Sequence, residues 1–139
     1  MDTMELRPGD GSERRPVVLA VDDDAVSLRI IRNTLEKNGF SVKTANSGEQ
    51  ALEELSHFVP DILLLDVMMP GLSGYEICLI TKKDPRLQNV PVIFLTGQDT
   101  PSDFSTGQAA GAVFYLTKPI RPDRLLQVVR MLPRSAPVA

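Results

Sequence analysis

The stretch that decides the fold of this chain is Asp61-Ile62-Leu63-Leu64-Leu65-Asp66-Val67-Met68-Met69-Pro70. Its four consecutive apolar residues are typical of a strand that is buried on both faces, as in a parallel sheet covered by helices. Asp66 ends this run, and open α/β sheets place ligands and catalytic groups at the carboxyl ends of their strands. An Asp ahead of Pro70-Gly71 is also good turn chemistry. The stretch alone therefore leaves Asp66 open to two interpretations, a functional carboxylate or a turn former.

Length and composition indicate one globular domain. The chain has 139 residues, of which 42% are hydrophobic and 24% charged, and this balance suits a folded core. Its net charge of -3 gives no general reason to expect nucleic-acid binding. The chain has no apolar run near the ~20 residues of a membrane span, residues 1–16 do not resemble a signal peptide, and the single Cys78 favours a reducing compartment. We therefore expect a cytoplasmic protein that binds neither membranes nor nucleic acids directly.

Strand and helix patterns alternate along the chain. Short apolar runs predict five strands, at residues 17–21, 40–44, 62–65, 90–95 and 112–116. Apolar residues at helical spacing predict a helix after each strand: one ended by Gly39, one opened by a capping-box pattern at Ser47 and Gln50, one from near Leu72 to before Asp84, one within 101–110, and one between Pro122 and Pro133. Asp24 is the expected N-cap of the first helix.

This alternation predicts an α/β fold with a parallel sheet between two layers of helices. Five strands fit the flavodoxin-like (βα)5 arrangement, with strand order 2-1-3-4-5. The domain is expected at residues 17–132, between a flexible N-terminal extension at 1–16 and a tail or linker at 133–139. In this order the first and third strands are neighbours, so we expect Asp22, Asp23 and Asp66 to converge at one edge of the sheet.

Three converging carboxylates need a neutralising charge. Two unit charges about 4 Å apart repel by roughly 4 kcal/mol at an effective dielectric of about 20. An all-oxygen set favours a hard cation such as Mg²⁺. The competing interpretation of Asp22, Asp23 and Asp24 is an N-cap with first-turn acids, but this leaves the strand-end position of the first two unexplained.

Two more polar residues follow strands. Thr96 comes after the fourth strand, and Lys118 comes shortly after the fifth. Each alone is an ordinary surface residue, but together with the acids they supply what phosphoryl transfer requires: oxygens for a metal, and a hydroxyl and an ammonium for phosphoryl oxygens. A carboxylate can itself be the nucleophile and form an aspartyl phosphate.

In this set of residues the chain resembles the receiver domains of two-component response regulators, including the chemotaxis regulators, over about residues 17–132. Five motifs in order carry the resemblance: Asp22-Asp23, Leu-Leu-Asp-Val-Met-Met-Pro-Gly-Leu-Ser-Gly at 64–74, Thr96, Ala-Gly-Ala at 110–112 and Tyr-Leu-Thr-Lys-Pro at 115–119. Each motif is weak alone, and together at this spacing they are specific.

The resemblance implies a role for each site residue. Asp66 would accept a phosphoryl group from a phosphohistidine on a sensor histidine kinase or phosphotransfer protein. Asp22 and Asp23 would hold Mg²⁺ with Asp66 and the backbone carbonyl of Met68.

Further roles follow from the same resemblance. Lys118 would bind the phosphoryl group, and Thr96 would turn inward to meet it. Tyr115 would follow Thr96 and reshape the surface of the fourth helix, fifth strand and fifth helix for a downstream effector. The Lys118–Pro119 bond would be cis. Such a protein catalyses only its own phosphorylation and dephosphorylation and is not otherwise an enzyme.

Some residues depart from the family pattern, and other functions stay open. Gln108 replaces an apolar residue, residues 104–107 are poor helix formers, and Val113-Phe114 replaces an acidic pair.

The alternative functions are a receiver-like scaffold that is never phosphorylated, an aspartate-nucleophile phosphatase and a flavin binder. A haloacid-dehalogenase-type phosphatase needs a second Asp where this chain has Met68, and a flavin binder is expected to have Gly, Ser and Thr where three acids follow the first strand.

Overall fold

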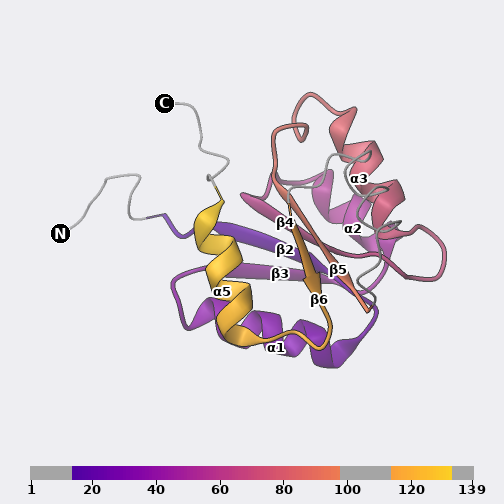
Figure 1. Cartoon of the computed structure of the whole chain (residues 1–139). Coiled ribbons are helices and arrows are strands. Elements are labelled where there is room, and N and C mark those ends of the chain that lie inside the picture. Colours follow the sequence, from indigo (N-terminus) through magenta and orange to yellow (C-terminus); the bar gives the residue numbers. More distant parts are fainter. Residues whose placement is uncertain (1–13, 98–113, 133–139) are drawn as a thin grey trace.

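The computed structural model describes residues 14–97 and 114–132 of the chain (Figure 1). Its elements follow in the order β2 (Val17–Val21), α1 (Ala25–Glu36), β3 (Ser41–Ala45), α2 (Gly48–Leu55), β4 (Ile62–Asp66), α3 (Gly74–Lys82), β5 (Val92–Thr96), β6 (Phe114–Thr117) and α5 (Pro122–Met131). The helix expected within 101–110 and the first two residues of the strand expected at 112–116 lie outside the described residues.

The strands form one parallel sheet in the order β3-β2-β4-β5-β6, which confirms the predicted order 2-1-3-4-5. Helices α1 and α5 cover one face, and α2 and α3 cover the other (Figure 1). Successive residues of β4 point to opposite faces, so Ile62 and Leu64 pack toward α1 and α5, whereas Leu63 and Leu65 pack toward α2 and α3. The four-residue apolar run is thus buried on both sides, as its sequence predicts.

The first strand has the predicted bounds 17–21, and boundaries of the later strands differ from the predicted ones by one or two residues. The second strand begins at Ser41, because the Phe40 N–H closes the end of α1 by donating to the Leu35 carbonyl at 3.0 Å. Pro91 lacks an N–H, and the fourth strand begins at Val92. Thr96 lies within β5 and not after it, because it pairs in register with Thr117, the last residue of β6.

The helix caps confirm one prediction and correct another. The Asp24 side chain accepts from the Val26 N–H at 3.0 Å, as expected for the N-cap of α1. Ser47 caps α2 by accepting from the Gln50 N–H, but the Gln50 amide oxygen accepts from Asn46, so the predicted capping box is incomplete. The complete box opens α3 instead, where Ser73 and Glu76 each accept the other's N–H.

A charged contact holds the amino edge of the sheet. Arg14 donates from both terminal nitrogens to the two carboxylate oxygens of Asp61, each at 3.1 Å. Asp61 is buried and also accepts from the Val17 N–H at 2.7 Å, while Pro16 accepts from the Ser41 N–H at 2.8 Å. Residues 14–16 therefore pack against the start of the sheet.

Cys78 lies on the buried side of α3, as its sequence context predicts. Burial raises the pKa of its thiol to about 11, against a weaker lowering effect of the Lys82 charge. Among residues 14–97 and 114–132, no helix combines the length and the apolar character that a bilayer span requires.

Candidate functional site

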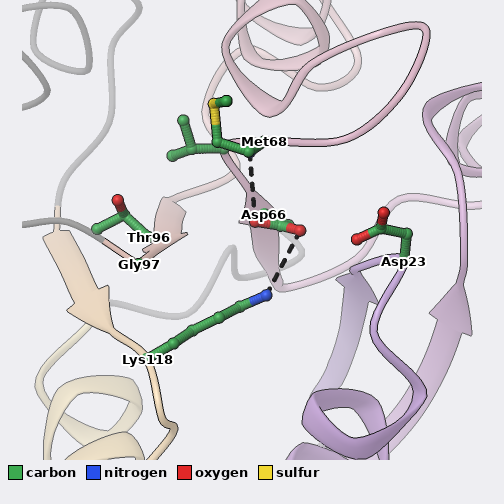
Figure 2. A pocket seen from close by; sticks show the side chains of 7 residues that line it. Asp23, Asp66, Met68, Thr96, Gly97 and Lys118 are labelled. Atoms are coloured by element: carbon green, nitrogen blue, oxygen red, sulfur yellow. Dashed lines mark hydrogen bonds and ion pairs between the residues drawn. The ribbon is translucent and has the colours of Figure 1, made fainter.

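The carboxyl edge of the sheet brings together the polar residues singled out in the sequence. Asp22 and Asp23 follow β2, Asp66 ends β4, Thr96 ends β5 and Lys118 follows β6. Figure 2 shows Asp23, Asp66, Thr96 and Lys118 around one cavity, with Met68 and Gly97 on its wall. The cavity has a volume of about 410 Å³ and is also lined by Val67. The expected convergence of strand ends is confirmed.

Three carboxylates meet beside this cavity, which Asp23 and Asp66 line. Asp22, Asp23 and Asp66 each place one oxygen within 4.8 Å of the others. Asp22 and Asp66 are buried, and Asp23 is exposed to solvent. Asp24 is turned away to cap α1, and its hydrogen bonds from Ser27 and Val26 lower the pKa of its carboxyl group. Of the three consecutive acids, Asp22 and Asp23 therefore join the carboxylate cluster, and Asp24 caps α1.

Lys118 is the cation that faces this cluster. Its Nζ lies 3.0 Å and 2.9 Å from the two carboxylate oxygens of Asp22, and 3.5 Å from Asp66 Oδ2. Burial opposes the charge of this ammonium group, but its hydrogen bond to Asp22 and the attraction of both carboxylates outweigh burial and raise the pKa of Lys118. The Lys118–Pro119 peptide bond is cis, as expected.

The carboxyl group of Asp66 lies farther from the Lys118 ammonium than that of Asp22 does. Burial, followed by repulsion from Asp22, raises the pKa of Asp66 to about 7. The charge of Lys118 and a hydrogen bond from the Met68 N–H at 3.3 Å oppose this rise without cancelling it. The Asp66 carboxyl group thus changes its charge near neutral pH.

The loop after Asp66 is packed against the start of α3. The Val67 N–H donates to the Leu95 carbonyl at 2.9 Å, and the Gly74 N–H donates to the Val67 carbonyl at 3.3 Å. A Cβ atom on Gly74 would collide with the carbonyl oxygen of Asp66, so only glycine fits there. Gly71 has a φ of +77°, which also favours glycine. Met68 lines the cavity while its side chain is exposed.

An aromatic cluster lies behind Thr96 on the same face of the sheet. Phe94 is fully buried, pairs in register with Tyr115 on β6, and contacts Tyr75 on α3. The hydroxyl oxygens of Tyr75 and Tyr115 lie 3.5 Å apart. Tyr115 was expected from its motif, whereas Tyr75 was expected only as a helix residue. Gly74 ends the motif at 64–74, but no role is predicted for it from the sequence, and Gly97 was missed because nothing in the local sequence separates it from an ordinary loop glycine.

The chain matches the family model "Response regulator receiver domain" over residues 18–130. It is 39% identical over 117 residues to the response regulator PleD of Caulobacter vibrioides, covering 84% of this chain and 26% of PleD. It is 42% identical over 117 residues to the response regulator MprA of Mycobacterium leprae, covering 84% of this chain and 50% of MprA. The chain therefore spans a quarter to a half of the length of these curated relatives.

Solved structures agree with the sequence relatives. The chemotaxis protein CheY4 of Vibrio cholerae superposes with a TM-score of 0.81 at 31% identity, covering 84% of this chain and 98% of CheY4. The receiver domain of a Francisella response regulator superposes with a TM-score of 0.75 at 33% identity, covering 84% of this chain and 94% of that domain.

Proposed function

Because this chain belongs to the response regulator receiver domain family, we propose that it is a signalling switch controlled by phosphorylation of Asp66. The observation that supports this most directly is the placement of Asp66. Its buried carboxyl group ends the central strand beside two further carboxylates, and it lies 3.5 Å from Lys118 at the wall of a cavity. These are the parts that an aspartate nucleophile and its anionic product require.

The proposed reaction transfers a phosphoryl group from a phosphohistidine to Asp66. A carboxylate oxygen of Asp66 attacks phosphorus, the phosphorus–nitrogen bond breaks, and the imidazole leaves with the bonding electron pair and takes up a proton. The product is an acyl phosphate on Asp66. Only the ionised carboxyl group attacks, and with a pKa of about 7 roughly half of the Asp66 carboxyl groups are ionised at pH 7.

Lys118 and Thr96 suit the binding of the transferred group. The ammonium of Lys118 already lies 3.5 Å from Asp66, so a small shift brings it to a phosphoryl oxygen on that residue. Thr96 is buried at the cavity wall and supplies a hydroxyl donor. Both contacts exist only once the phosphoryl group is present, and they therefore favour a rearranged state of β5 and β6.

The donor set of the acidic cluster fits Mg²⁺. Three carboxylate oxygens within 4.8 Å form the hard, all-oxygen environment that this ion prefers, and Asp22, Asp23, Asp66 and the Met68 carbonyl would hold it. When bound, the ion neutralises negative charge on the transferring phosphoryl oxygens.

The implied partners follow from this reaction. A sensor histidine kinase or a phosphotransfer protein supplies the phosphoryl group in the cytoplasm, and an effector domain or protein reads the surface of β6, α5 and the fourth helix that is expected within 101–110. The domain itself covers residues 17–132, with 1–16 and 133–139 as flanking segments. In this proposal the output lies in such a partner or in a linked domain.

Labelling with acetyl phosphate tests this function. With Mg²⁺, intact-mass measurement is expected to show one added phosphoryl group on the wild-type chain, and none on Asp66→Asn. Asp23→Asn is expected to slow labelling and raise the Mg²⁺ concentration it needs. Asp123→Asn, which removes an exposed carboxylate of α5, serves as the matched control and is expected to label normally. Labelling of Asp66→Asn at another residue would contradict the assignment.

A further inference from the structure

We propose that Tyr75 is a positioning residue for Tyr115, and that α3 provides a second contact route from Asp66 to Tyr115 beside the route through Thr96. The positioning role concerns the unphosphorylated chain. The second route deepens the proposed function and rests on it, and the two parts are therefore tested by separate measurements.

The contacts of Tyr75 support the positioning role. Its ring meets the Phe94 ring edge-on, with centroids 4.7 Å apart and an interplanar angle of 81°. The Tyr115 ring lies against the same Phe94 at 5.5 Å, with an angle of 56°. The two tyrosine hydroxyl oxygens are 3.5 Å apart, at the long end of hydrogen-bonding distance. Tyr75 and Tyr115 thus both pack against the buried ring of Phe94, and their hydroxyl groups lie side by side.

The backbone before Tyr75 lies directly against Asp66. Gly74 leaves no room for a Cβ atom between itself and the Asp66 carbonyl oxygen, and its N–H donates to the Val67 carbonyl at 3.3 Å. The capping box of Ser73 and Glu76 fixes the first turn of α3. A backbone shift at Asp66 therefore acts on Tyr75 through tightly packed atoms, without a flexible side chain between them.

The route through Thr96 reaches Tyr115 from the other side. Thr96 and Phe94 are two residues apart on β5 and so point to the same face of the sheet. Phe94 is the direct cross-strand neighbour of Tyr115. The two routes meet at Phe94 and Tyr115, and each one is expected to carry part of the coupling between phosphorylation and the position of Tyr115.

A plain core role for Tyr75 makes a different prediction. If Tyr75 only fills space, its hydroxyl group is dispensable and a phenylalanine ring against Phe94 suffices. If Tyr75 positions Tyr115, removal of the hydroxyl alone changes the environment of Tyr115. Tyr75→Phe separates these two cases, because it keeps the ring and removes one oxygen.

The composition of the chain makes this measurable, because it contains two tyrosines. Labelling with 3-fluorotyrosine gives two ¹⁹F resonances, assigned with Tyr75→Phe and Tyr115→Phe. In the unphosphorylated chain, Tyr75→Phe is expected to shift or broaden the Tyr115 resonance. Leu79→Ala, which trims a half-exposed residue of the same helix, is the control and is expected to leave it in place. An unchanged Tyr115 resonance in Tyr75→Phe would overturn the positioning role.

The second measurement adds beryllium fluoride and Mg²⁺ to imitate the phosphorylated state. The shift of the Tyr115 resonance is expected to fall to about half in Thr96→Val and to vanish in Thr96→Val with Tyr75→Leu, which also removes the ring. Complete loss of the shift in Thr96→Val alone would overturn the second route.

If the Tyr115 resonance of the wild-type chain does not shift and Asp66 is not labelled by acetyl phosphate, the proposed function fails, and the second route fails with it. The effect of Tyr75→Phe on the unphosphorylated chain would still stand.

Discussion

One buried aspartate precedes β4 and another ends it, and the two carboxyl groups differ in their hydrogen-bond and charge partners. Asp61, at the amino edge, accepts two hydrogen bonds from Arg14 at 3.1 Å and one from the Val17 N–H at 2.7 Å. Asp66, at the carboxyl edge, accepts a longer bond from the Met68 N–H and shares Lys118 with Asp22. The two residues are almost equally buried, at 3% and 4% exposed.

The difference shows how the two ends of one strand can hold a structural carboxylate and a carboxylate that is suited to reaction. A buried charge with good partners holds a fold together, and removing one partner is costly. For a buried carboxyl group that is crowded by like charges, the ionised form is instead unfavourable. Such groups are typical of functional sites. Burial is the same at both ends, so the partners decide the role.

The largest effect is expected for Asp61→Asn. The change removes the charge that holds Arg14 and weakens the contact to Val17, and we expect it to lower the free energy of unfolding by about 3 kcal/mol. Urea denaturation at pH 8 measures this loss. The exposed pair of Asp123 with Arg121 gives the control, because Asp123→Asn is expected to cost at most about 0.5 kcal/mol. Equal losses in the two variants would remove the distinction between the two ends of β4.

Asp66→Asn is expected to act in the opposite direction. The pKa of Asp66 in the folded chain lies above its ordinary value, so the free energy of unfolding falls as the pH rises from about 4 to about 7. At ~1.4 kcal/mol per pKa unit, and allowing for solvent in the cavity, we expect Asp66→Asn to stabilise the Mg²⁺-free chain by about 2 kcal/mol at pH 8. At pH 5, where most Asp66 is protonated, the gain should fall below half. A destabilised variant at pH 8 would contradict this account.

Mg²⁺ binding should depend on the same proton. The ion requires ionised carboxylates, so its apparent affinity is expected to rise about tenfold per pH unit below pH 7 and to level off above it. Calorimetric titration between pH 5.5 and 8.5 follows this dependence. In Asp66→Asn the rise around pH 7 should disappear. A wild-type affinity that is constant across this range would show that Asp66 is already ionised at low pH.

The smallest effect is expected for Arg14→Lys. Lysine keeps the positive charge but cannot donate two parallel hydrogen bonds to Asp61, and we expect a loss of about 1 kcal/mol in the free energy of unfolding. Arg15→Lys is the matched control, because the neighbouring Arg15 is exposed. A loss no larger than that of the control would mean that charge alone stabilises the amino edge.

The sequence predicts the carboxyl edge better than the amino edge, for a physical reason. In a parallel sheet the strand ends meet, so polar residues such as Asp66, Thr96 and Lys118 can be placed together from the strand pattern alone. The pair of Arg14 with Asp61 joins residues 47 apart, and Arg14 lies in a segment without hydrophobic periodicity. No local rule connects them.

Two other features escaped prediction because they depend on three-dimensional packing. Ser47 and Ser73 begin the same capping pattern, and only the path of the backbone before each one decides whether the side chain three residues on reaches back to it. The contact of Tyr75 with Tyr115 joins a helix to an edge of the described sheet. Helical spacing places Tyr75 in the third predicted helix but does not identify its partner.

The burial of Cys78 makes its thiol a reporter of local opening at α3. A thiol with a pKa of about 11, enclosed beneath α3, is protonated at neutral pH and shielded from reagents, so alkylation must wait until the helix lifts from the sheet. The rate of Cys78 modification therefore reports how readily α3 opens. Because the chain has a single cysteine, this measurement needs no mutation.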